Sequence, residues 1–132
     1  MTENINIQLV TPLNILTSKD VSMAVLPGSE GDLGIMYRHT PMMTLLNRGF
    51  VKLFEGDQIV ENIVIDGGVL EVNETGIIVL SERAEIIKNS NKQIIQEKLI
   101  NSEKLAKNND QSISSIANDE SDFYRFVLNA FN

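Results

Sequence analysis

The first two thirds of the chain consist of short apolar runs separated by turns rich in glycine and asparagine. Ile5, Ile7 and Leu9 alternate with polar residues, and a period of two indicates a half-buried strand. Many short strands at close spacing favour an antiparallel β-sandwich or barrel. We predict ten strands, at residues 5–9, 13–16, 21–26, 33–36, 42–46, 50–54, 59–65, 69–72, 77–80 and 84–87.

After Lys88 the apolar spacing becomes helical. A first helix is predicted over residues 91–107, because Ile95 and Leu99 lie four residues apart on one face. The polar stretch 108–120 predicts a linker. A second helix is predicted over residues 121–131, whose apolar side chains recur three and four residues apart at Phe123, Phe126, Val127, Ala130 and Phe131. This pair either folds as a hairpin on itself or on the sheet, or its second helix detaches and binds a partner.

The charge of the chain changes where its hydrophobic period changes. Residues 1–87 carry twelve acidic and five basic side chains, which account for the whole net charge of -7. Residues 88–132 carry six of each and are neutral. The two changes together predict a β-sandwich domain at 1–87 and a helical hairpin at 88–132. The acidic balance argues against nucleic acid as a partner.

Composition limits the kind of protein and the kinds of site that the chain can form. Hydrophobic residues make up 42% of the 132 residues, which is enough for a packed core. The chain has no cysteine, so disulfides, thiolate nucleophiles and zinc–thiolate sites are excluded. Its first residues lack the basic start and apolar run of a signal peptide, and no apolar stretch approaches the roughly 20 residues of a membrane span.

The stretch 26–35 carries the most distinctive local chemistry. It holds three glycines at a spacing of three, at positions 28, 31 and 34, which indicates a tightly turned loop between strands. Glu30 and Asp32 make its tip acidic, and no basic residue follows until Arg38. The stretch is therefore either an ordinary turn or a surface that a partner contacts.

The sequence offers little for catalysis. His39 is the only histidine, which excludes multi-histidine metal sites and histidine dyads. There is no Gly-x-Ser-x-Gly elbow, and the stretch 26–35 has neither the Gly-Lys-Ser/Thr ending of a phosphate loop nor the following helix of a dinucleotide site. We predict no catalytic residue, metal site, nucleotide-binding site or cofactor. A hydrolase using Glu30 and Asp32 is the enzymatic alternative, although solvated turn acids explain this pair more simply.

Four motifs, taken in order, make the chain resemble the epsilon chain of the rotary ATP synthase. Each motif is weak alone, but their order and spacing over residues 28–84 are specific. The motifs are Gly28-Ser29-Glu30-Gly31-Asp32-Leu33-Gly34-Ile35, His39-x-Pro41, Gly67-Gly68-Val69-Leu70-Glu71-Val72 and Val79-Leu80-Ser81-Glu82-Arg83-Ala84.

The resemblance implies a ten-stranded sandwich joined to a helical hairpin, with no chemistry of its own. It implies a central-stalk subunit that links the gamma subunit to the c-ring and so couples proton flow to ATP synthesis. By position, it implies that Glu30, Gly31 and Asp32 contact the c-ring loops and that His39 faces gamma. It also implies a peripheral place on the cytoplasmic face of the bacterial inner membrane.

The tail departs from the family. Many relatives bind ATP with an Asp-x-x-Arg-Ala motif, whose charged positions here fall on Asn91 and Ile94, with Ile95 at the alanine. We therefore predict no ATP binding by the tail. The family's last helix inserts among the catalytic alpha and beta subunits with basic residues, whereas the predicted helix here carries only Arg125, so we predict weak or absent inhibition of ATP hydrolysis. The alternative to a stalk subunit is a free-standing sandwich module with a regulatory helical tail.

Overall fold

Eight strands and two helices make up the computed structural model, which describes residues 3–74 and 76–131. Residues 1, 2 and 132, at the ends of the two predicted domains, lie outside this description. The chain divides into two compact units, Met1–Ile86 and Ile87–Asn132. The elements are β1 (Ile5–Val10), β2 (Ile15–Val21), β3 (Met23–Gly28), β4 (Gly31–Ile35), β5 (Met42–Glu55), β6 (Gln58–Val72), β7 (Gly76–Leu80), β8 (Ala84–Ile86), a 3-10 turn (Asn89–Asn91), α1 (Lys92–Leu105) and α2 (Gln111–Asn129).

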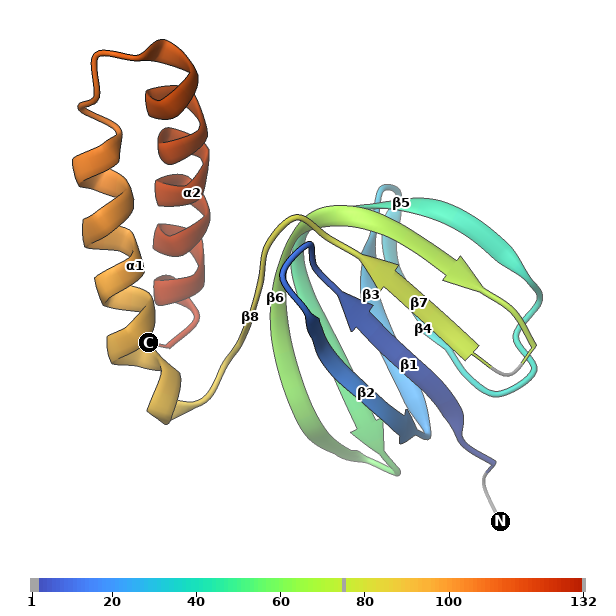
Figure 1. The fold of residues 1–132 in the computed structure, drawn as a ribbon. Helices are drawn as coiled ribbons and strands as arrows, with labels where there is room; N and C mark the ends of the chain where they lie inside the picture. The colour runs from blue at the N-terminus through green and yellow to red at the C-terminus, as the bar shows by residue number, and fades with distance from the viewer. Residues whose placement is uncertain (1–2, 75, 132) are drawn as a thin grey trace. The chain divides into compact units, whose positions relative to one another are not determined.

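The prediction of ten strands is wrong by two, because two predicted pairs are each one long strand. Segments 42–46 and 50–54 are both parts of β5, and segments 59–65 and 69–72 are both parts of β6. The glycine-containing stretches between them bend the strands without ending them, and both strands curve strongly (Figure 1). Gly68 has a φ of 144° at the bend of β6, a backbone conformation that residues with a side chain rarely adopt.

The bends divide the strands into two layers. Along the hydrogen-bonded path the order is β2-β1-β7-β6-β5-β3-β4, and β8 pairs with the middle of β6. The first half of β6 pairs with the second half of β5 beside β3 and β4, whereas the second half of β6 pairs with the first half of β5 and with β7. The predicted mainly β sandwich is thus confirmed. One pair departs from an antiparallel arrangement, because β1 and β7 lie side by side in parallel.

The core lies between the layers and is built from alternate residues. Ile5, Ile7 and Leu9 of β1 are all fully buried, as their period of two predicts. A part-buried carboxylate also joins the two layers: Glu61 of β6 accepts a hydrogen bond from the Thr17 hydroxyl and from Lys19 Nζ at 2.8 Å, both on β2. The sandwich is therefore tied across its layers by polar contacts as well as by its core.

The helical unit is a hairpin in which α1 and α2 run side by side (Figure 1). The predicted start of the second helix is wrong by ten residues, because α2 begins at Gln111. Asp110 caps it by accepting from the Ser112 backbone N–H at 2.9 Å and from the Ser112 hydroxyl at 2.7 Å, and these bonds lower the pKa of its carboxyl.

Small residues let the two helices approach each other. Ser102 of α1 and Ser121 of α2 are buried, and their hydroxyl oxygens are 2.9 Å apart in a hydrogen bond. Ala117, one turn before Ser121, is buried as well. The prediction of a polar linker over residues 108–120 is therefore wrong from Gln111 onward, where α2 begins and packs against α1 through small residues such as Ala117.

Candidate partner-binding surfaces

The acidic stretch forms a tight hairpin between β3 and β4. Gly28 pairs with Gly31, so only Ser29 and Glu30 lie in the turn. Gly31 has a φ of 127°, and a Cβ on Gly28 would lie 2.6 Å from the Gly31 carbonyl oxygen. Gly31 therefore needs to be glycine for its backbone angle, and Gly28 for its close contact with the carbonyl oxygen.

The hairpin is anchored against β5. The Ser29 N–H donates to the Leu45 carbonyl oxygen at 3.3 Å, and Asn47 Nδ2 donates to the Gly28 carbonyl oxygen at 3.3 Å. Glu30 and Asp32 are exposed, and neither carboxylate has a hydrogen bond or ion pair within the described residues. The sandwich thus holds the three residues predicted to contact the c-ring, Glu30, Gly31 and Asp32, at an exposed tip with unpaired negative charge.

His39 lies in the loop that joins β4 to β5. Its backbone N–H donates to the Met36 carbonyl oxygen at 3.0 Å, and its Nδ1 lies 2.7 Å from the Thr40 carbonyl oxygen. Because a carbonyl oxygen only accepts, a hydrogen bond at this contact requires the proton on Nδ1. The preceding N–H, of Arg38, donates to the Glu74 carbonyl oxygen at 3.1 Å and ties this loop to the turn between β6 and β7.

An exposed apolar row crosses the outer face of one layer. The register aligns Leu45 with Val69, Val69 with Leu80, Leu80 with Val10 and Val10 with Ile15, one residue from each of five neighbouring strands. Leu45 is 64% exposed, Leu80 50% and Ile15 58%. We call these five residues the outer apolar row. A contiguous apolar surface of this kind is typical of a protein–protein contact.

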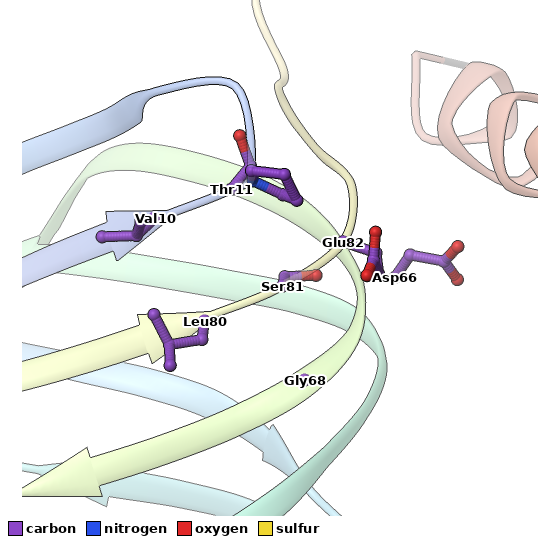
Figure 2. A pocket seen from close by; sticks show the side chains of 8 residues that line it. Val10, Thr11, Asp66, Gly68, Leu80, Ser81 and Glu82 are labelled. Atoms are coloured by element: carbon purple, nitrogen blue, oxygen red, sulfur yellow. The ribbon is translucent and has the colours of Figure 1, made fainter.

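A recess of about 410 Å³ opens beside the middle of the outer apolar row, where Leu80 and Val10 line it. Figure 2 shows Val10 and Leu80 on one side of it and the carboxylates of Asp66 and Glu82 on the other. Asp66 is already held by Arg48 Nε at 2.7 Å and Arg83 Nη1 at 2.6 Å. These ion pairs fix the bend of β6 against the segment before β8, so the recess has a rigid rim.

The hydroxyl groups and carboxylates of the recess come from Thr11, Ser81, Asp66 and Glu82. The hydroxyl of Ser81 donates to the Arg83 carbonyl oxygen at 2.9 Å, and no histidine lines the recess. Within the described ranges, 3–74 and 76–131, no cluster of three metal-binding side chains occurs. Neither of the helices described there has the length and apolar character needed to cross a bilayer.

The sequence reasoning missed the outer apolar row. Its signal is the continuous apolar run, such as Ile77 to Leu80, in which residues of both faces are apolar. Such a run indicates a strand that is covered on both sides.

Comparison of the sequence with known families matches residues 4–87 to the family described as ATP synthase, Delta/Epsilon chain, beta-sandwich domain. An ATP synthase epsilon chain from Paramagnetospirillum magneticum is 40% identical over 84 residues, which cover 64% of this chain and 63% of that protein. One from Sulfurimonas denitrificans is 29% identical over 115 residues, which cover 85% of this chain and 88% of that protein. The match thus spans less than two thirds of the Paramagnetospirillum protein, as it does for a third relative, from Parvibaculum lavamentivorans, at 62%.

Solved structures share the fold. A chain in the cryo-EM structure of Euglena gracilis mitochondrial ATP synthase, OSCP/F1/c-ring, matches with a TM-score of 0.64 at 16% identity, covering 100% of this chain and 84% of that one. A chain in the Tetrahymena thermophila mitochondrial ATP synthase central stalk and c-ring matches with a TM-score of 0.58 at 14% identity, covering 99% and 98%. The resemblance drawn from the four motifs is confirmed, and the chain belongs to the ATP synthase delta/epsilon chain family.

Proposed function

We propose that this chain is a non-catalytic central-stalk subunit of a rotary ATP synthase, which links the gamma subunit to the c-ring. In this role it is peripheral to the membrane, on the cytoplasmic face in a bacterium. It transmits the rotation of the c-ring, which proton flow drives, to the gamma subunit and so couples proton flow to ATP synthesis. It needs no cofactor of its own.

The observation that carries the proposal is that one sandwich presents two surfaces of different chemistry. The acidic tip at Glu30 to Asp32 is exposed and unpaired within the described residues, which suits the polar loops of a ring. The outer apolar row suits the larger, permanent contact with gamma, because obligate interfaces are the more apolar ones. The Ser29–Leu45 hydrogen bond joins the tip directly to the row. Family membership and the likeness to central-stalk chains support the same role.

His39 lies on the gamma side in this proposal. Its loop is tied to Glu74, in the turn that follows β6, at the end of the layer that carries the outer apolar row. The imidazole is half-buried, so it suits a short-range contact at the edge of the gamma interface.

Charge reversal at the tip tests the c-ring contact. Asp32→Lys is expected to lower proton-driven ATP synthesis by at least half. In this proposal the acidic tip meets basic residues on the ring loops, and placing like charges against each other across an interface costs several kcal/mol. The melting temperature of the isolated chain should not change, since Asp32 is exposed. Synthesis and hydrolysis are measured in inverted membrane vesicles.

Asp57→Lys is the matched control, because Asp57 is an equally exposed acid in the turn between β5 and β6. It should leave coupling intact. Equal coupling in Asp32→Lys and Asp57→Lys would show that the tip does not contact the ring.

The tail is proposed to contribute little to regulation. Arg125, the only base of α2, is engaged by Glu103 at 2.9 Å and Asp122 at 3.0 Å. Ile95, at the alanine position of the relatives' ATP motif, is fully buried, and no charged residue takes the place of that motif's anion or cation. Contact with the alpha and beta subunits through these helices is therefore weak in this proposal.

Removing residues 111–132 tests this view of the tail. The ATP hydrolysis rate of the purified complex is expected to change less than about twofold, which corresponds to under 0.5 kcal/mol in activation free energy. A rise of tenfold or more in the truncated complex would establish α2 as an inhibitor.

A further inference from the structure

Arg38 adopts a backbone conformation that favours glycine. Its φ is 65°, and it is the only non-glycine residue with a positive φ in the described parts of the chain. The left-handed conformation costs a residue with a side chain about 1–2 kcal/mol. The loop therefore carries an arginine where glycine would be easier to accommodate.

The loop holds this conformation with hydrogen bonds on both sides. Arg38 N–H donates to the Glu74 carbonyl oxygen at 3.1 Å, and His39 N–H donates to the Met36 carbonyl oxygen at 3.0 Å. The guanidinium carbon of Arg38 lies 5.5 Å from the centre of the Tyr37 ring, within the range of a cation–π contact. The side chain is thus oriented before any partner arrives.

The guanidinium of Arg38 has no anionic partner in the described residues. The other three arginines each pair with a carboxylate: Arg48 and Arg83 with Asp66, and Arg125 with Glu103. Arg38 is exposed, forms no such ion pair, and its guanidinium donates no hydrogen bond within residues 3–74 and 76–131. Arg38 and Glu74 both line a second recess, of about 440 Å³, yet the Glu74 carboxylate does not pair with Arg38.

We propose that Arg38 is a specificity-determining contact, whose guanidinium binds an aspartate or glutamate carboxylate on the protein that covers the outer apolar row. This inference rests on the proposed function, in which that protein is the gamma subunit. A planar guanidinium held over an aromatic ring presents its N–H donors in a fixed direction, which suits a bidentate carboxylate contact.

A protein carboxylate fits this residue better than an anionic lipid. Membrane binding through charge takes a cluster of about four to eight basic residues. Arg38 instead stands on a domain with twelve acidic and five basic side chains, which an anionic membrane repels. Arg38 is a single oriented guanidinium in a loop tied to Glu74, at the end of the layer that carries the outer apolar row, and arginine is enriched in protein interfaces.

The experiment compares Arg38→Gly and Arg38→Lys with the unchanged full chain in binding to the gamma subunit of the same organism. Arg38→Gly removes the guanidinium and suits the backbone, so its melting temperature is expected to equal or exceed that of the unchanged chain. Its Kd for gamma is expected to rise about tenfold at low salt, as for loss of one charged interface contact. Arg38→Lys keeps the positive charge but loses the planar guanidinium, so its Kd for gamma should lie between those of Arg38→Gly and the unchanged chain.

Lys52→Ala is the control for loss of one positive charge, because Lys52 lies in the second half of β5, in the other layer. Its Kd should stay within twofold of the unchanged chain. The difference in Kd between Arg38→Gly and the unchanged chain should shrink as salt rises from about 50 to 500 mM, because salt screens the ion pair.

Each remaining outcome overturns the inference. An unchanged Kd for Arg38→Gly would show that the guanidinium makes no contact with gamma, and a lower melting temperature with an unchanged Kd would assign Arg38 to the fold. Binding of the unchanged chain, but not of Arg38→Gly, to vesicles of phosphatidylglycerol would assign it to lipid. Absence of gamma binding by the unchanged chain would instead refute the proposed function, so the two failures are distinguishable.

Discussion

Replacing Gly68 with alanine is expected to lower the free energy of unfolding of the sandwich by roughly 3 kcal/mol or more. Gly68 has a φ of 144°, and a Cβ built there would overlap the carbonyl oxygen of Leu80 on β7. The carbonyl oxygen belongs to the backbone and cannot turn aside as the end of a flexible side chain could. The backbone of β6 or β7 therefore has to move. A loss of this size lowers the melting temperature by roughly 10 °C in a protein of this length.

Gly56→Ala is the matched control for this prediction. Gly56 also has a positive φ, of 59°, but a Cβ there meets no atom within 4 Å. Its substitution should cost about 1–2 kcal/mol, the backbone term alone. Thermal or urea unfolding of the isolated chain measures both values. Equal losses would show that the close contact between β6 and β7 at the bend contributes nothing.

Replacing Leu80 with aspartate is expected to weaken binding to the gamma subunit by about a hundredfold or more, because central apolar residues dominate interface energies. Leu80 stands in the middle of the outer apolar row and is 50% exposed in the isolated chain. An aspartate there stays solvated in the free chain, so the chain should fold normally. In the complex the carboxylate would be buried without a partner, which is costly.

Ile59→Asp provides the comparison for Leu80→Asp. Ile59 is 53% exposed, but it lies at the start of β6, away from the row. Calorimetry or surface binding with purified gamma gives both Kd values. If Ile59→Asp weakened binding as much as Leu80→Asp does, the gamma interface would not be confined to the row.

Much of the sandwich could be predicted because burial in a strand follows a period of two. Ile5, Ile7 and Leu9 alternate with polar residues and are fully buried, so the sequence and the structure agree there. The number of strands could not be predicted in the same way. A glycine pair such as Gly67-Gly68 ends a strand in one protein and bends it in another, and only the pairing of β6 with both β5 and β7 decides between these.

The second helix shows how tertiary packing overrides composition. Residues 111–120 are rich in serine and have few large apolar side chains, which alone favours a linker. The helix nevertheless extends over these residues, because Ala117 is buried and the Ser102–Ser121 hydrogen bond just beyond the stretch joins α2 to α1. The contact depends on residues 19 positions apart and is invisible to a local pattern.

The candidate surfaces were predictable in part. The acidic tip is marked by Gly28, Glu30 and Asp32 in sequence, and the structure places it at the surface. The outer apolar row needs the register of five strands, which no single segment contains. The conformation of Arg38 depends on a hydrogen bond to Glu74, far along the chain, and could not be read from the sequence.

A cryo-EM structure of the ATP synthase purified through an affinity tag on this chain would show what each surface contacts in the assembled complex. We expect the outer apolar row to be buried against gamma and Glu30 to Asp32 to lie against the c-ring loops. Recovery of the tagged chain without the rest of the ATP synthase would contradict the central-stalk role, as would a complex in which the row and the acidic tip both face solvent.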